Sequence, residues 1–195
     1  MSQVLFISET FLREYTNVGA NVQNNILTNS IRKSQTIKIQ SILGKALYDK
    51  IDNDLYNAGG SISGLTGNYA ILFTDYVVPA LTAWSFYECI VPLTLKFTNK
   101  GINRAQDSYS EGIDLETMKF IRNDARNEAE WITERLTTYL CNNTGLFPEY
   151  SDYSAQDLYP STKAGTYNSG IYMKKRKKVS NNFFPDKDDY TKFEF

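Results

Sequence analysis

Histidine is absent from this 195-residue chain, and its absence removes much of known active-site chemistry. Without histidine there is no Ser-His-Asp triad, no Cys-His dyad, no imidazole acid or base and no imidazole ligand for zinc. Cysteine is scarce too: Cys89 and Cys141 cannot build a four-cysteine metal site or a disulfide scaffold. We expect both thiols to be reduced, small apolar residues, which fits synthesis in a reducing compartment. We expect no enzymatic activity, no metal and no cofactor.

A strong excess of charge is also missing. The net charge is −1 and the sequence pI is about 5.6, which argues against a generally basic, nucleic-acid-binding surface. The start of the chain lacks a basic region, and its apolar run at 4–7 is too short for a signal peptide. The most apolar stretch, 76–87, has the length of a buried core helix, so we expect no membrane span.

Apolar residues are present in quantity, at 42%, and most of them recur at helical spacing. Ser8 and Glu9 predict a short helix start, 17–21 a turn, and 27–55 a helical pattern in which Gln35 takes one inward position. The glycine-rich segment 57–67 predicts a loop, and Thr66 is placed to cap the helix that follows.

The following segment, 69–97, is apolar on most faces and is therefore the predicted central helix. Pro79 and Pro92 each remove a backbone donor, so we expect this helix to be kinked or broken. Residues 98–113 predict a polar connection. Asp114 is the predicted cap of the clearest amphipathic helix, about 115–141, whose apolar stripe is Leu115, Met118, Ile121, Ala125, Ala129, Ile132, Leu136 and Leu140.

The stretch Gly44-Lys45 admits two interpretations, a phosphate-binding loop or a joint between two helices. A phosphate loop needs a second glycine five residues earlier and a serine or threonine after the lysine, between a strand and a helix. Position 39 is isoleucine, Ala46 follows the lysine, and helical patterns flank both sides. We therefore predict a joint between helices at Gly44.

Two further features suggest sites. The cluster Asp49, Asp52 and Asp54 is dense enough to bind a hard cation, although an exposed helix end explains it more simply. A metal-dependent enzyme, for instance a nuclease, is the corresponding minor hypothesis. We expect Trp84 and Trp131 to pack in the core, with interface anchoring as the second interpretation.

From residue 148 onward no helical period survives, yet aromatic residues remain frequent. Solvated disordered tails are poor in aromatics, so we predict a helical domain over 1–147 and an extended arm over 148–195 that docks on a partner. Within the arm, Lys174, Lys175, Arg176, Lys177 and Lys178 form a basic cluster that could contact DNA phosphates or an acidic protein surface, or could be a solvated charge run. The predicted interface residues are Tyr172, Phe183, Phe184, Tyr190, Phe193 and Phe195.

The order of several helix-packing motifs resembles the head–tail connector (adaptor or ring) proteins of tailed bacteriophages, and is most similar to those of Bacteroidetes phages, including the crAss-like group. The similarity covers roughly residues 4–147. Its motifs are Leu43-Gly44 with Leu47-Tyr48, the segment from Tyr76 through Pro79 to Trp84, the "NKG" that follows, and the last long helix ending at Tyr139-Leu140.

This resemblance implies an all-α, bundle-like subunit of about four to five helices with a mostly irregular C-terminal arm. It implies a closed ring, expected to hold about twelve copies, in the neck of the virion. The ring would join the portal to other neck and tail proteins around the channel through which DNA passes, after synthesis in the bacterial host cytoplasm. The arm has no counterpart in the resemblance. A small DNA-binding module that acts through Lys174–Lys178 is the alternative function, and salt-sensitive DNA binding would distinguish it.

Overall fold

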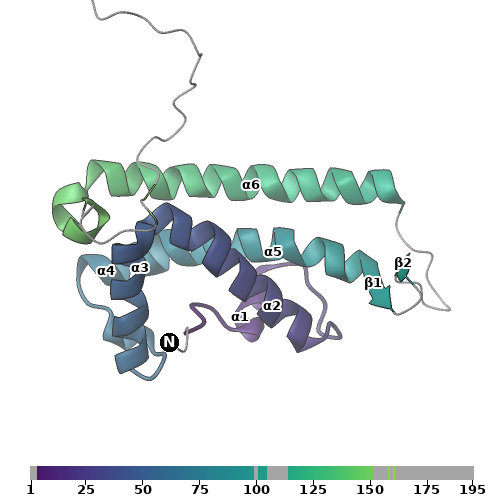
Figure 1. Cartoon of the computed structure of the whole chain (residues 1–195), viewed down its shortest axis with the longest axis horizontal. Helices are drawn as coiled ribbons and strands as arrows, with labels where there is room; N and C mark the ends of the chain where they lie inside the picture. Colours follow the sequence, from purple (N-terminus) through teal and green to yellow (C-terminus); the bar gives the residue numbers. More distant parts are fainter. Residues whose placement is uncertain (1–3, 99–100, 105–113, 152–157, 159, 161–195) are drawn as a thin grey trace, which may run out of the picture. The chain divides into compact units, whose positions relative to one another are not determined.

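A computed structural model of the chain describes residues 4–98, 101–104, 114–151, 158 and 160, all of which belong to one unit, Met1–Gly165. This unit is an all-α bundle, which confirms the predicted fold class (Figure 1). In the described residues its α-helices are α1 Glu9–Tyr15, α2 Asn24–Ser34, α3 Gln40–Asn57, α4 Asn68–Leu72, α5 Val78–Thr94 and α6 Leu115–Asn142. A short antiparallel hairpin, β1 Leu95–Thr98 with β2 Gly101–Arg104, follows α5.

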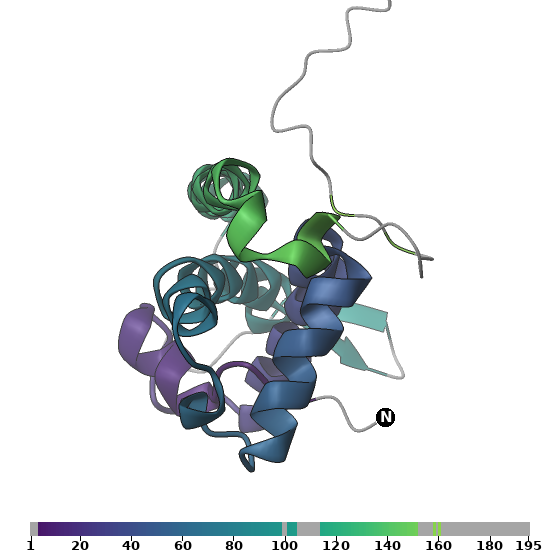
Figure 2. The same ribbon diagram turned by 90° about the vertical axis from the view of Figure 1, so that its left-hand side faces the viewer.

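Helix α5 is the central element, as the sequence predicts. It packs against α2 on one side and against α6 on another, and Figures 1 and 2 show α6 running alongside it. The segment Asn68–Thr94 is apolar and long enough to cross a membrane by those two criteria alone, but half of its most apolar window is already buried in the bundle. Core helices meet the same criteria, so this segment is weak evidence for a membrane span.

The two prolines of this segment are accommodated differently. A π-helical turn, η3 Phe73–Val77, joins α4 to α5 and places Pro79 in the first turn of α5. The amide of Val78 bonds to the carbonyl of Phe73, five residues back. This wider turn directly precedes Pro79, which has no backbone N–H to donate. Pro92 lies inside α5, whose last residue is Thr94. The expected interruption at Pro79 is thus a π turn.

Two expected boundaries of this segment were wrong. Thr66 does not cap it: Gly67 is the N-cap residue with φ 58° and ψ −130°, a conformation that favours glycine, and the helix starts at Asn68, one residue before the predicted segment. The helix also stops at Thr94 instead of 97, and Leu95 has extended backbone angles. Residues 95–98 and 101–104 then pair as strands, with Leu95 opposite Arg104, where part of a polar connection was expected.

The chain from α2 to α3 is one helical run with two irregularities. The first is a π-helical turn, η1 Gln35–Ile39, which leaves Gln35 and Ile39 buried. The second is Gly44, where φ 73° and ψ 165° break the helix inside α3 and confirm the predicted joint. At this break the backbone amide of Lys45 donates to the carbonyl of Leu158 at 3.1 Å, and Pro160 lies against Gly44.

Helix α6 begins as predicted, because the Asp114 side chain accepts a hydrogen bond from the amide of Glu116 at 3.2 Å. Its apolar stripe is only partly buried. Ala125, Ala129, Leu136 and Leu140 enter the interior, whereas Leu115 and Ile121 are 47% and 36% exposed. For Leu115 the reason is the early end of α5: Thr94 contacts Met118 (Oγ1 to Sδ 3.0 Å), so the first turn of α6 extends beyond its partner helix. Ile121 lies where α6 runs beside α5, and its partial exposure has no such explanation.

The packed body continues past residue 147, the predicted domain boundary. A short 3₁₀ turn, η5 Pro148–Ser151, packs against α3, and Phe147 and Tyr150 are almost fully buried. Tyr150 belongs to the same apolar core as Leu12 of α1 and Leu47 of α3. The helical body therefore includes residues that the sequence assigned to the arm.

Candidate interaction surfaces

The basic cluster Lys174–Lys178 lies outside the described residues. The same holds for the six aromatic residues that were predicted to form an interface, Tyr172, Phe183, Phe184, Tyr190, Phe193 and Phe195. Their roles stay predictions. Cys89 is buried and Cys141 is half-buried, and neither thiol is in a disulfide.

The acidic cluster does not converge on a common point. Asp49 pairs with Lys45 at 2.8 Å and Asp54 with Lys50 at 3.0 Å, each across one helical turn. Asp52 accepts a hydrogen bond from the backbone amide of Val4 at 3.1 Å. Within the described part of the chain, no three metal-binding side chains gather in one place. The geometry therefore gives these carboxylates separate structural partners.

Asp52→Asn is expected to raise stability slightly at neutral pH. Burial, and to a lesser degree Asp49, raise the pKa of Asp52, while the Val4 amide opposes this shift. Because folding raises the pKa of Asp52, its contribution to stability is fully present below its pKa in the unfolded state, near 4. This contribution is lost as the pH rises through its pKa in the folded state. Asparagine keeps an acceptor for Val4 without the charge, so we expect a gain of a few tenths of a kcal/mol, about 0.3, after solvent screening.

Urea unfolding of both proteins at pH 3 and pH 7 measures this effect. The difference between them should appear at pH 7 and vanish at pH 3, where Asp52 is protonated. A loss of stability at pH 7 would mean that the charged form is preferred.

A groove lies between the N-terminal segment with α1 and the helices α5 and α6. One of its walls is fixed by Gln35, which is fully buried. The Gln35 side chain accepts from the Phe6 amide at 3.0 Å and donates to the Val4 carbonyl at 2.7 Å and to the Tyr48 hydroxyl at 2.8 Å. These bonds hold the extended segment before α1 against the bundle, with Phe6 stacked on Tyr48 at 5.2 Å.

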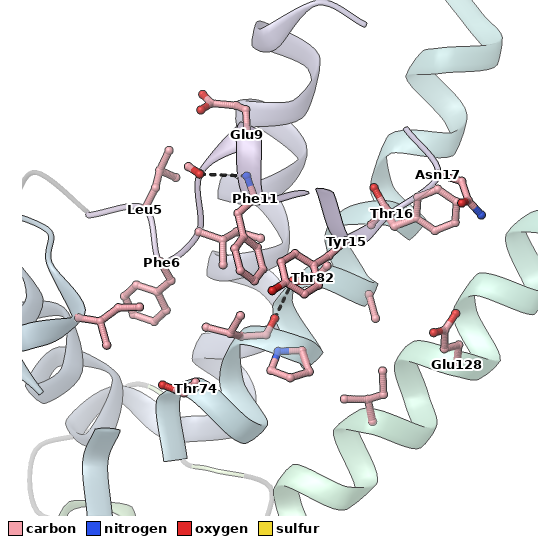
Figure 3. Close-up of a pocket in the computed structure, with 18 of the residues that line it drawn as sticks. Leu5, Phe6, Glu9, Phe11, Tyr15, Thr16, Asn17, Thr74, Thr82 and Glu128 are labelled. Atoms are coloured by element: carbon pink, nitrogen blue, oxygen red, sulfur yellow. Dashed lines mark hydrogen bonds between the residues drawn. The ribbon is translucent and has the colours of Figure 1, made fainter. Parts of the chain in front are cut away.

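The groove has a volume of about 850 Å³ and a mainly apolar lining (Figure 3). From α1, Phe11 and Tyr15 stack on each other with ring centroids 4.2 Å apart. From α5, Pro79 and Phe86 contribute to the floor. The other apolar lining residues are Leu5, Phe6, Ile7, Ile62, Val78, Ala83 and Ile132. Tyr15 is 68% exposed, so a large aromatic face of the groove is open to solvent.

In the described part of the chain, the charged side chains that line the groove are both acidic, Glu9 from α1 and Glu128 from α6. The hydroxyl of Thr28 donates to Glu9, and this bond lowers the pKa of Glu9, which keeps it ionised at neutral pH. Arg13, on the same helix, bonds to the carbonyls of Gly19 and Val22 at 2.7 and 2.5 Å. The groove therefore combines a mainly apolar lining with two acidic residues, which Figure 3 shows on different sides of it.

A second surface is the outer face of α6, the face that points away from α5 in Figures 1 and 2. Phe120 and Trp131 are 73% and 65% exposed. They are eleven residues apart, which is about three turns, so they share one helix face about 16 Å apart. Trp131 thus contradicts its expected core position, whereas Trp84 is buried as predicted and donates to Thr133 at 2.8 Å.

Sequence reasoning missed both surfaces. The position of Trp131 was available from the helical period: Ile132, its neighbour, lies on the apolar stripe, so Trp131 lies to one side of it. Phe120 is recognisable in the same way. The groove had no comparable signal, because its walls come from segments that are far apart in the sequence.

A family model matches residues 39–158, more than half of the chain. The chain belongs to DUF6712, a family of unknown function. No curated protein and no solved structure matches significantly.

The DUF6712 match contains the Gly44 joint, the central helix and all of α6 with Phe120 and Trp131. The wall of the groove that is formed by residues 5–17 precedes the match, and the basic cluster Lys174–Lys178 follows it. The DUF6712 region therefore covers α3 to α6, while α1, α2 and the groove wall at residues 5–17 lie before it.

Proposed function

We propose that this protein is a structural virion component whose copies assemble into a ring between the phage portal and the tail, around the channel for DNA. The observation that carries the proposal is the pair of exposed aromatics, Phe120 and Trp131, on one face of α6. Aromatic side chains of this kind are enriched at the energetic centres of protein interfaces. The resemblance to head–tail connectors supplies the kind of assembly.

A ring requires that each copy present two different surfaces, because head-to-tail contacts close only when unlike faces meet. The outer face of α6 and the groove beside α1 are two such surfaces on one subunit. The aromatic-rich residues after Pro160 would add contact area on neighbouring copies or on the portal. No catalytic step is part of the proposal.

The direct test is to purify the full-length protein and record its mass by native mass spectrometry, alone and mixed with the portal protein. The expected result is a closed homo-oligomer, or one that forms when portal is added, visible as rings in electron micrographs. A protein that stays monomeric with portal present, and is absent from purified virions, would reject the proposal.

Trp131→Ala and Phe120→Ala are each expected to weaken assembly about 10–100-fold without lowering the melting temperature of the subunit. Both side chains are largely exposed in the subunit, so their removal leaves the core unchanged. Sedimentation velocity over a concentration series measures the assembly constant, and thermal unfolding checks the fold.

Tyr56→Ala is the matched control, because Tyr56 is a similarly exposed aromatic (59%) on α3. It should leave the assembly constant within about twofold of the unmodified protein, as expected for an exposed residue outside the contact. Equal effects of all three substitutions would show that the α6 face is not the contact.

A further inference from the structure

We propose that the groove between α1, α5 and α6 is a receptor for the segment Ile171–Lys178 of a second copy of this chain. The inference rests on the proposed self-assembly and adds to it the site and the segment that meet. In this arrangement the apolar residues Ile171, Tyr172 and Met173 enter the groove, and the basic cluster is attracted by its acidic lining residues, Glu9 and Glu128.

The first argument is the groove's size and lining. About 850 Å³ is within the range of roughly 300–1,000 Å³ that is typical of ligand pockets, and it is enough for several side chains. Phe11, Tyr15, Pro79 and Phe86 give it aromatic and apolar walls. An extended peptide with bulky apolar residues fits such a surface, and apolar contact supplies most of its binding energy.

The second argument is charge. Among the residues that the structure describes, the groove lining carries Glu9 and Glu128 and no lysine or arginine. Glu9 is held ionised by Thr28, and Glu128 extends from α6 toward the groove in Figure 3. Arg13 keeps its charge and acts on Glu9, but its guanidinium bonds to backbone carbonyls and Arg13 is not a lining residue. The acidic lining residues therefore favour a cationic segment over an acidic one.

The third argument is that the chain has one segment with the matching order of residues. After Pro160, residues 171–173 are the apolar run that leads directly into five consecutive cations at 174–178. Residues 180–195 also contain large apolar side chains, mainly phenylalanine, but their net charge is −2, with four acids against two lysines. Charge complementarity therefore selects Ile171–Lys178 over the C-terminal aromatics.

The test uses photo-crosslinking in the full-length protein with Tyr172→p-benzoylphenylalanine. Copies with this residue and natural isotopes are mixed with ¹⁵N-labelled copies without it, and crosslinked peptides are identified by mass spectrometry. The expected crosslinks join the two isotope forms and end at Phe11–Tyr15 or Val78–Phe86, the α1 and α5 walls of the groove.

A charge reversal makes the test specific. Glu128→Lys in the labelled copy is expected to lower the crosslink yield about fivefold or more, because the groove lining then carries a cation that repels the basic cluster. Lys174→Glu with Lys175→Glu in the probe-bearing copy should restore much of that yield. Glu14→Lys is the control: Glu14 is an exposed acid on α1 that does not line the groove, and its change should leave the yield unaltered.

Several outcomes overturn the inference. Crosslinks confined to the probe-bearing isotope form, with none to the ¹⁵N-labelled copies in a mixed oligomer, would place the segment on its own chain. Crosslinks to another surface would assign the groove a different role. The probe at position 172 could instead crosslink efficiently to added duplex DNA, with salt-sensitive binding that the cluster variants abolish. That result would identify the cluster as a nucleic-acid contact. Native masses from the same samples separate the two proposals: rings with crosslinks elsewhere reject only the docking site, whereas monomers reject both.

Discussion

Gln35→Leu is expected to lower the free energy of unfolding by about 2–4 kcal/mol. Leucine has a similar size, but it leaves the amide of Phe6 and the carbonyl of Val4 without the hydrogen bonds that Gln35 provides. Phe6 is only 6% exposed, so water replaces this partner poorly. Because the same bonds hold one wall of the groove, the segment before α1 should loosen before the rest of the fold.

Urea unfolding gives the stability, and hydrogen exchange gives the location of the change. We expect the amide of Phe6 to exchange faster in the variant even under conditions where the bundle is intact. Gln23→Leu is the control, since Gln23 is exposed at the start of α2 and its side chain makes no capping bond. A loss equal to that of the control would show that Gln35 is not the anchor of the N-terminal segment.

Gly44→Ala is expected to cost about 3 kcal/mol or more for two separate reasons. The backbone at Gly44 has φ 73° and ψ 165°, a region that residues with a side chain avoid. In addition, a Cβ at this position would lie 2.6 Å from Cδ of Pro160, which is closer than atoms can pack. Thermal or urea unfolding measures the loss, and a cost near zero would show that the joint is not rigid.

Two other glycines separate these causes. Gly59 has φ 67° but nothing within 4 Å of its would-be Cβ, so Gly59→Ala reports the backbone cost alone, about 1 kcal/mol. Gly19→Ala, with neither a positive φ nor a close neighbour, should be almost neutral. Pro160→Ala in the Gly44→Ala protein should recover the steric part but not the backbone part. Additive effects of these two substitutions would place Pro160 outside the contact.

Local sequence signals were sufficient for most of the secondary structure. Ser8 and Asp114 cap α1 and α6 as predicted, since each needs only a side-chain oxygen beside the first helical amides. The joint at Gly44 and the inward position of Gln35 follow from residue type and helical spacing. These features depend on interactions within a few residues, which a single sequence contains.

Predictions failed where a neighbour in space made the decision. The stripe of α6 predicted burial of Leu115, but burial needs a partner helix, and α5 ends near Met118. Trp131 was expected inside because tryptophan is mostly apolar, yet α5 contacts the other face of α6. Thr66 is a good cap by type, but the chain turns into the helix at Gly67.

The sequence by itself determined an all-α body, the starts of α1 and α6, the break at Gly44 and the lack of histidine chemistry. Only the tertiary structure decided which apolar residues stay exposed and which distant segments form a common surface. The groove needs residues 5–17, α5 and α6 together, and its acidic lining residues Glu9 and Glu128 are more than a hundred residues apart in the sequence. Periodicity describes one helix at a time, whereas a surface between helices depends on their packing, which follows from the whole core.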